Sequence, residues 1–141
     1  MSRSKKPKPT PLPGTFVLDS EGLSKAVAHD DAVVDLLATA HRHDIPVVIS
    51  SATLVEATHP KINRRALDWR LSMLSIEPVT EQVAQDATEL LTGAGKHGHS
   101  HAIDAMVCAT AVASPRPVRI LTSDPDDITA LAGDHVSVIA V

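Results

Sequence analysis

The amino-acid sequence predicts an α/β fold: a three-layer α/β/α sandwich with a five-stranded, mainly parallel sheet. Short apolar runs alternate along the chain with longer segments of helical periodicity, which is the order that parallel βαβ units produce. Two of the runs, residues 15–18 and 46–49, consist of apolar or β-branched residues throughout. Strands of that composition are buried on both faces of a parallel sheet, so helices should cover both sides.

The same patterns define each element in order. We expect strands at residues 15–18, 46–49, 74–79, 118–122 and 136–141. We expect helices at about residues 22–28, 31–43, 51–60, 62–73, 81–91, 101–113 and 125–133. Thr80 and Ser100 are expected helix caps, and Asp124-Pro125 is a strong start signal. Gly93 and Gly95 should end the fifth helix, and a loop should follow over residues 96–100.

A single domain accounts for most of the chain. The 141 residues suffice for one hydrophobic core in residues 14–141, whereas residues 1–13 form a basic, Pro-rich tail that we expect to be disordered. The single cysteine, Cys108, excludes an internal disulfide and is typical of a reducing compartment. No apolar run approaches the roughly 20 residues of a membrane span, and the basic start lacks the apolar segment of a signal peptide. We therefore expect a soluble, cytoplasmic protein.

The charge is distributed unevenly. The first 14 residues carry four Lys or Arg and no acid, whereas the remainder carries nine Lys or Arg against all 17 acids. The tail could contact phosphates, although a solvated extension is the simpler interpretation. Nucleic-acid-binding domains are usually basic, so a nucleic-acid substrate of this acidic body would need cations to mediate its binding.

Four acids are expected at the carboxyl ends of the strands, where open α/β sheets bind ligands. Asp19 ends the first strand and Asp124 follows the fourth. Glu56 lies about two turns into the helix after the second strand, and Asp104 lies one turn inside the helix that starts at His101. Glu56 and Asp104 have apolar neighbours and few nearby cations, and a desolvated carboxylate is rarely left unpaired.

A divalent cation would explain such a cluster. Carboxylates that share one pocket repel and raise one another's pKa unless a metal holds them. An all-carboxylate set suits Mg²⁺ or Mn²⁺, with waters completing an octahedron. Each acid also has a purely structural interpretation, since Asp124 could be a helix cap and Asp19 a turn residue.

The segments around these acids resemble the acidic motifs of the PIN-domain family. The segments are residues 16–20, 55–57, 102–111 and 120–128. More narrowly, their size and spacing over about residues 14–141 resemble the VapC-type toxins of bacterial toxin–antitoxin pairs. The resemblance implies a five-stranded parallel sheet, a Mg²⁺- or Mn²⁺-dependent ribonuclease activity, frequent homodimers and inhibition by a small antitoxin.

The resemblance also assigns residues. Asp19, Glu56, Asp104 and Asp124 match the family's metal-binding acids, and Asp127 matches a further acid that some members have, although it could equally be the helix-cap partner of Asp124. Metal ions support phosphodiester hydrolysis by lowering the pKa of the attacking water and neutralising developing charge. We expect Asp19, Asp104 and Asp124 to hold the principal metal. Glu56 would orient or deprotonate the water, or complete a second metal site.

Three histidines alternate just before the Asp104 helix: His97, His99 and His101. A transition-metal site would need further ligands at wider spacing, so we favour a loop at the RNA entrance. Two other polar residues lie near the acids. Cys108 is expected to be a small buried residue rather than a reactive thiol, and Thr122 an ordinary strand residue rather than a partner of a metal-bound water.

The predicted helix at 62–73 is the candidate partner surface. Ile62, Ala66, Trp69 and Met73 form one apolar stripe, beside a second stripe of three leucines. A helix so broadly apolar either buries two faces or offers one to another chain, and Trp is frequent in interfaces. The resemblance favours an interface for an antitoxin, with Arg64, Arg65 and Arg70 available to an acidic segment or to RNA phosphates.

Other functions remain open at this point. A nuclease of RNA processing that is not a toxin, or a PIN-like RNA-binding module without catalysis, would share the motifs. A phosphotransferase with Asp19 as nucleophile would share the sheet and the acid at the strand end, but it usually needs a well-placed Lys, and the later strands offer only Arg116 and Arg119.

Overall fold

The computed structural model describes residues 13–141, so the predicted basic tail lies outside the described residues except for Pro13. The strands are β1 (Thr15–Leu18), β2 (Val47–Ser50), β3 (Ser75–Glu77), β4 (Val118–Thr122) and β5 (Ser137–Ala140). The helices are α1 (Ser20–Val27), α2 (Asp31–Arg42), α3 (Ser51–Ala57), α4 (Arg64–Leu71), α5 (Glu81–Ala94), α6 (Gly98–Val112) and α7 (Pro125–Ala132). A 3-10 turn, η1 (Gly133–His135), precedes β5.

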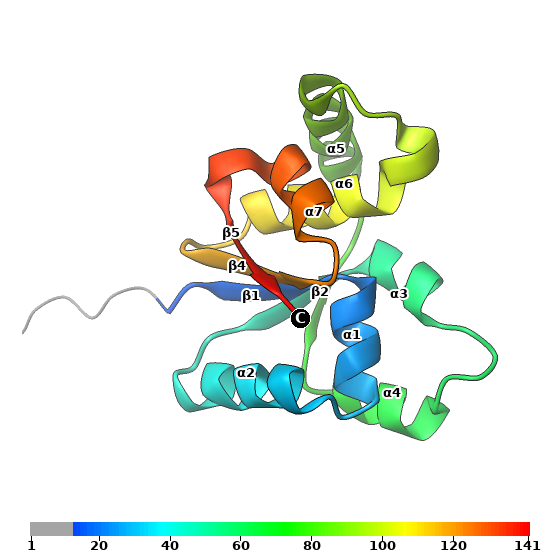
Figure 1. Cartoon of the computed structure of the whole chain (residues 1–141), viewed down its shortest axis with the longest axis vertical. Helices are drawn as coiled ribbons and strands as arrows, with labels where there is room; N and C mark the ends of the chain where they lie inside the picture. Colours follow the sequence, from blue (N-terminus) through cyan, green and yellow to red (C-terminus); the bar gives the residue numbers. More distant parts are fainter. Residues whose placement is uncertain (1–12) are drawn as a thin grey trace, which may run out of the picture.

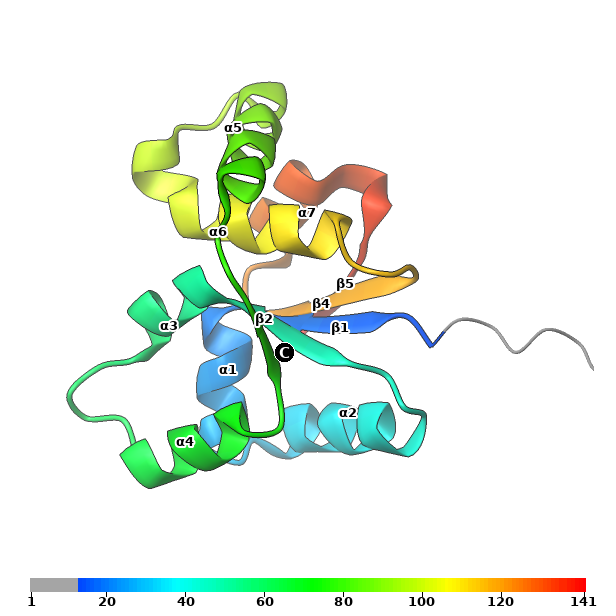
Figure 2. The same cartoon turned by 180° about the vertical axis from the view of Figure 1, so that it is seen from behind.

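The sheet is parallel throughout and has the order β3-β2-β1-β4-β5, with β1 at its centre. Val17 of β1 pairs with Val48 on one side and with Ile120 on the other. Helices α5, α6 and α7 cover one face, and α1, α2 and α4 cover the other (Figures 1 and 2). The predicted three-layer α/β/α architecture is confirmed.

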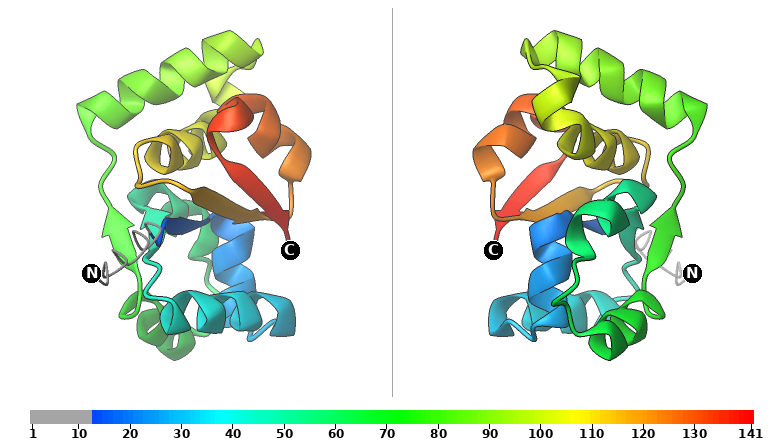
Figure 3. Two further views of the ribbon diagram at one scale, coloured as in Figure 1. Left: turned by 90° about the vertical axis from the view of Figure 1, so that its left-hand side faces the viewer. Right: turned by 90° about the vertical axis from the view of Figure 1, so that its right-hand side faces the viewer.

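The core explains why the central runs are apolar without interruption. Phe16 and Leu18 pack into the cluster formed with α1 and α2, whereas Val17 between them packs into the cluster formed with α6 and α7. Both faces of β1 are therefore buried, and all four of its residues are buried. Small residues carry the outer packing: Ala87 of α5 meets Ala105 and Ala109 of α6, which allows a close approach of the two helices. Figure 3 shows α5 as the outermost helix of this layer.

Several helix boundaries differ from the sequence prediction, and two of them, the end of α5 and the start of α6, lie near the expected site. Helix α5 runs through Gly93 to Ala94 and ends at Gly95, whose φ of 64° is the left-handed conformation that glycine adopts readily. Helix α6 begins at Gly98, not at His101, with His97 in the cap position. Ser100 is therefore not the helix cap, and most of the predicted loop is a helical turn. A kink at His101, with φ −128° and ψ 17°, separates this first turn from the rest of α6.

The edge strand β3 is shorter than predicted. It covers Ser75–Glu77, all three residues are exposed, and Pro78 follows directly. Short, proline-limited edge strands restrict further strand pairing. Among the described residues, no helix combines the length and the apolar character that crossing a membrane requires.

Candidate active site

Asp19 lies at the junction of β1 and α1 and is held from both sides. Its Oδ1 accepts a hydrogen bond of 2.7 Å from the Gly22 N–H, and its own N–H donates to the Leu121 carbonyl at 3.2 Å. A side chain at Gly22 would not fit, because its Cβ would lie 2.8 Å from the Leu121 oxygen. Asp19 is thus the N-cap of α1, and one of its two carboxylate oxygens remains outside this capping bond.

Burial governs the charge of Asp19. Only 6% of the residue is exposed, and this burial raises its pKa above the usual 3.8. Hydrogen bonds from the Thr122 side chain and the Gly22 backbone oppose the rise, and the charges of Glu21 and Glu56 add to it. The carboxyl end of β1 therefore presents a fixed carboxylate, and no cation among the described residues acts to lower its pKa.

Asp104 lies about one helical turn beyond the kink of α6 at His101. It is the residue on which the other acids of this edge act. Its pKa is raised from 3.8 to about 6, first by burial and then by the charges of Glu56, Asp19, Asp124 and Asp127. The three other acids predicted from the sequence as principal site residues, and Asp127, therefore all act on Asp104. Such a rise is the expected result of gathering like charges.

Asp124 and Asp127 form a pair at the start of α7. Asp124 occupies the N-cap position, but its side chain makes no capping bond to the helix backbone. Its side chain instead hydrogen-bonds to Asp127, which raises the pKa of Asp124 and lowers that of Asp127. Thr122 also has a specific contact, because its Oγ1 accepts a 2.9 Å hydrogen bond from the Asp124 N–H. The structure thus gives Thr122 a positioning contact that an ordinary strand residue would lack.

Lys96 reaches the cluster from the α5–α6 connection. Its Nζ lies 3.3 Å from Oδ1 of Asp127, and both side chains are partly shielded from solvent. This ion pair contributes to the lowered pKa of Asp127. One lysine cannot balance five carboxylates, so the edge keeps a negative excess.

Glu56 lies near the end of α3 and is exposed to solvent. The expectation that it is desolvated by apolar neighbours is wrong, because its neighbour Val55 is itself 78% exposed, while Thr53 and Ala57 face the interior. Glu56 nevertheless lies within electrostatic range of Asp19 and Asp104, whose pKa values it raises. It is an exposed acid beside the buried ones.

His101 is a histidine that the sequence patterns favoured as part of a loop rather than as a metal ligand. Its imidazole and the carboxylates of Asp104 and Asp127 each offer a ligand atom, and these atoms lie within 4.8 Å of one another. His97 and His99 are exposed, whereas His101 is partly buried. The spacing of three residues between His101 and Asp104, which places both on one helix face, was the available signal.

The donor chemistry of this edge fits a divalent cation. It gathers carboxylate oxygens with a negative excess, which hard divalent cations neutralise. Two buried hydroxyls on the same elements, of Ser20 beside Asp19 and of Thr53 one turn before Glu56, have no hydrogen-bond partner among the described residues. Two cavities lie away from these acids: one of about 360 Å³ is lined by residues such as Thr15 and Pro46, and one of about 370 Å³ by residues such as Arg116.

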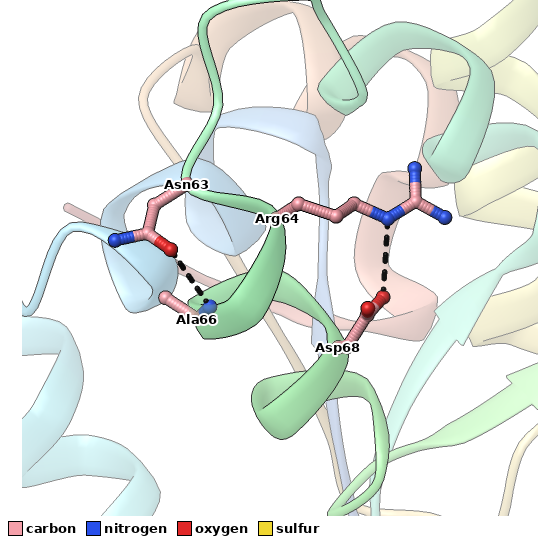
Figure 4. Close-up of polar contacts among 4 residues, drawn as sticks. All are labelled: Asn63, Arg64, Ala66 and Asp68. Atoms are coloured by element: carbon pink, nitrogen blue, oxygen red, sulfur yellow. Dashed lines mark hydrogen bonds and ion pairs between the residues drawn. The ribbon is translucent and has the colours of Figure 1, made fainter.

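The proposed partner helix α4 exposes part of its apolar stripe. Trp69 and Met73 are each 52% exposed, whereas Ile62 and Ala66 pack against the core. The Asn63 side chain caps the helix by accepting from the Ala66 N–H at 3.0 Å (Figure 4). The predicted second stripe is internal, with Leu67 1% exposed and Leu71 and Leu74 partly buried against the core.

The arginines of α4 differ in availability. Arg64 pairs with Asp68 at 3.2 Å on the surface (Figure 4). Arg65 is exposed, but Arg70 is buried and its guanidinium lies 4.7 Å from the ring centre of Trp69. Burial lowers the pKa of Arg70, and its Nε has no hydrogen-bond partner among the described residues. The expectation that Arg70 is freely available to an acidic segment or a phosphate is therefore wrong.

Comparison with solved structures identifies the fold. The chain is similar to VapBC2 from Rickettsia felis, bound to a promoter DNA fragment, with a TM-score of 0.67 and 18% identity, covering 90% of this chain and 98% of the other. It is similar to FitAcB from Neisseria gonorrhoeae, with a TM-score of 0.59, 20% identity, and 89% and 96% coverage. A VapBC-5 structure from Mycobacterium tuberculosis gives a TM-score of 0.55, 25% identity, and 91% and 99% coverage.

Sequence comparisons add nothing to this likeness, because no protein-family model matches the chain and no curated protein matches it. The similar structures are of VapBC and FitAB toxin–antitoxin systems, whose toxin subunits are PIN domains. The five-stranded parallel sheet and the coverage agree with the resemblance drawn from the sequence motifs. The chain has the PIN-domain fold of the VapC-type toxins.

Proposed function

We propose that the protein is a Mg²⁺- or Mn²⁺-dependent endoribonuclease that hydrolyses RNA phosphodiesters with a metal-activated water. The observation that carries this proposal is the gathering of Glu56, Asp19, Asp124 and Asp127 around Asp104, whose pKa is raised to about 6 by burial and then by the charges of these four carboxylates. Such a cluster is unfavourable without a cation and is the usual setting for metal-assisted hydrolysis. The PIN-domain fold supports a nuclease rather than another metal-dependent activity.

Each acid has a distinct part in this mechanism. Asp19, Asp104 and Asp124 hold the principal cation directly or through water, and Asp127 lies close enough to contribute. When bound, the cation lowers the pKa of a water and neutralises charge on the phosphate. Binding of a cation also favours the deprotonated form of Asp104. Exposed Glu56 is free to orient the attacking water or to accept its proton.

The rigidity of two ligands follows from their backbone contacts. Asp19 is fixed by the Gly22 N–H, and Asp124 is fixed through the Thr122 hydroxyl that accepts from its N–H. Thr122 is fully buried at the end of β4, and its side chain also hydrogen-bonds to Asp19. Preorganised ligands of this kind avoid reorganisation during the reaction.

We further infer that the protein is the toxin of a toxin–antitoxin pair. Support comes from the similar VapBC and FitAB structures, and from the exposed Trp69 of α4 and Met73 just after the helix, which offer apolar surface to a small antitoxin. Trp69 is the only tryptophan, so docking of the neighbouring gene's product should blue-shift its fluorescence. An unchanged spectrum on binding would place the partner elsewhere. A homodimer is expected as well, which light scattering tests directly.

The decisive experiment incubates purified protein with total RNA in Mg²⁺, Mn²⁺ or EDTA. Cleavage should require a divalent ion and should be lost in Asp104→Asn. The matched control is Asp35→Asn on α2, an exposed acid in the layer on the other face of the sheet. Cleavage that persists in EDTA, or in Asp104→Asn at the wild-type rate, contradicts the proposal. Metal binding without any cleavage would favour a PIN-like RNA-binding module.

One observation favours a second candidate, an aspartyl phosphotransferase. Such an enzyme needs a lysine near its nucleophile, and Lys96 does reach the acidic cluster. Its partner, however, is Asp127 at 3.3 Å, and the capping bond already engages Oδ1 of Asp19. Trapping of a phosphoenzyme with an acyl-phosphate donor would decide for this candidate, and we expect no label on Asp19.

A further inference from the structure

We propose that His101 supplies a nitrogen ligand to a divalent cation that Asp104 and Asp127 also bind, and that this ligand makes the site prefer Mn²⁺ and similar transition ions to Mg²⁺. The observation is the group of three side chains whose ligand atoms lie within 4.8 Å of one another. The inference rests on the proposed function only for the presence of a cation at this edge.

The backbone brings these three residues together from two helices. His101 lies at the kink of α6, and Asp104 follows three residues later on the same helix face. Asp127 occupies the first turn of α7. The two helices are locked by buried contacts, since Val107 and Cys108 of α6 pack with Ile128 and Leu131 of α7. The group is therefore held by the core and not by surface loops.

Burial distinguishes His101 from the two histidines before it. His97 and His99 are exposed, whereas His101, Asp104 and Asp127 are all partly buried. A partly buried imidazole beside two carboxylates can offer its nitrogen lone pair to a cation that the carboxylates also bind. The neighbouring histidines on the same segment serve as internal controls.

Ligand chemistry gives the expected selectivity. Mg²⁺ prefers oxygen ligands and gives up its waters reluctantly, whereas first-row transition ions accept imidazole nitrogen well. A set of two carboxylates and one imidazole therefore adds affinity for Mn²⁺ that it does not add for Mg²⁺. The acidic residues Asp19, Asp124 and Glu56 would bind either ion without this discrimination.

Lys96 competes with the cation for Asp127. Its Nζ lies 3.3 Å from Oδ1 of Asp127, which is also one of the three ligand residues. A cation on this group must share or displace that ion pair. Removal of the lysine should therefore strengthen binding of both metals, while removal of the imidazole should weaken mainly Mn²⁺.

Binding of Mn²⁺ and Mg²⁺ alone, measured by calorimetry on the full-length protein, tests the selectivity. His101→Gln should lower the affinity for Mn²⁺ by about tenfold or more and that for Mg²⁺ by less than about threefold. His99→Gln should change neither, and Lys96→Met should raise both. An unchanged ratio of the two affinities in His101→Gln, or a loss of affinity in Lys96→Met, overturns the proposal. Circular dichroism on each variant excludes misfolding, and His101→Asn provides a second replacement.

Pulsed electron paramagnetic resonance of bound Mn²⁺ gives a direct readout. Wild-type protein and His99→Gln should show coupling to a nitrogen nucleus, and His101→Gln should lose it. Nitrogen coupling that persists in His101→Gln overturns the assignment. Coupling in a protein that cleaves no RNA would keep the ligand assignment and refute the proposed function. Metal-dependent cleavage without nitrogen coupling would support the proposed function and refute His101 as a ligand.

Discussion

Two neighbouring strand ends in this protein begin a helix with an aspartate, yet they use it differently. At the β1–α1 junction, Asp19 is buried and caps its helix through a 2.7 Å bond to the Gly22 N–H. At the β4–α7 junction, Asp124 is exposed, and its side chain makes no capping bond to the helix backbone but pairs with the Asp127 side chain. The third helical position is Gly22 in one junction and Asp127 in the other. The carboxylate of the first junction stabilises its helix, whereas that of the second remains outside any capping bond.

The largest effect should come from Asp19→Asn. The amide oxygen can still accept from the Gly22 N–H, so the cap and the fold should persist, but the charge is lost. Metal-dependent cleavage should fall by at least about a hundredfold, since a direct ligand matters no less than its surroundings. Cleavage assays with Mn²⁺ test the loss of activity, and a thermal melt tests whether the fold persists. Full activity in this variant would remove Asp19 from the metal site.

Gly22→Ala should break the first junction by crowding. The new Cβ would lie 2.8 Å from the Leu121 carbonyl oxygen, which belongs to the adjacent strand and cannot move freely. We expect a loss of about 2 kcal/mol in the free energy of unfolding, measured by urea denaturation. Gly93→Ala is the matched control, because its Cβ would meet nothing within 4 Å. It should be neutral or slightly stabilising.

Asp104→Asn should stabilise the protein in EDTA while abolishing metal-induced stabilisation. A rise of the pKa from 3.8 to about 6 corresponds to about 3 kcal/mol, and solvent screening of this partly exposed side chain leaves about 1 kcal/mol. The folded state holds the proton more tightly, so the wild type loses this stability as pH rises through about 6. The advantage of the variant should therefore be full above pH 7 and shrink toward pH 4. Paired melts across this range test the sign.

The smallest effect on stability should come from Asp124→Ala. Because this side chain makes no capping bond, the free energy of unfolding should change by less than about 0.5 kcal/mol. Asp19→Ala, by contrast, should lose about 1 kcal/mol with its cap. Cleavage should fall in both. Equal destabilisation of the two alanine variants would contradict the distinction between the junctions.

The sequence was sufficient to predict the elements that the core determines. The uninterrupted apolar runs of β1 and β2 gave the central sheet, and with it the edge at which Asp19 and Asp124 meet. Helix α6 was harder, because Ser100 has the chemistry of a cap while the packing of α6 on α5 and α7 sets the true start at Gly98. The contribution of His101 depends on that start and on the kink.

Exposure was also hard to predict from neighbours in the sequence. Glu56 has apolar neighbours, but Val55 beside it faces solvent, so the sequence context gave the wrong environment. The prediction for Arg70 failed in the opposite sense, because this expected surface residue is buried. Its long aliphatic stem allows burial beside Trp69, which residue type alone does not reveal.

The crowding of carboxylates around Asp104 has a kinetic consequence. The residues after the tail carry nine Lys or Arg against 17 acids, and five of these acids converge where a polyanion would be cleaved. Encounter with the proposed RNA substrate would therefore be opposed by long-range repulsion, which mobile ions screen. Association of RNA with this body should accelerate as monovalent salt rises from low concentrations, the reverse of the usual behaviour of nucleic-acid-binding proteins. The proposed divalent ion would then act on the rate of encounter as well as on the chemistry.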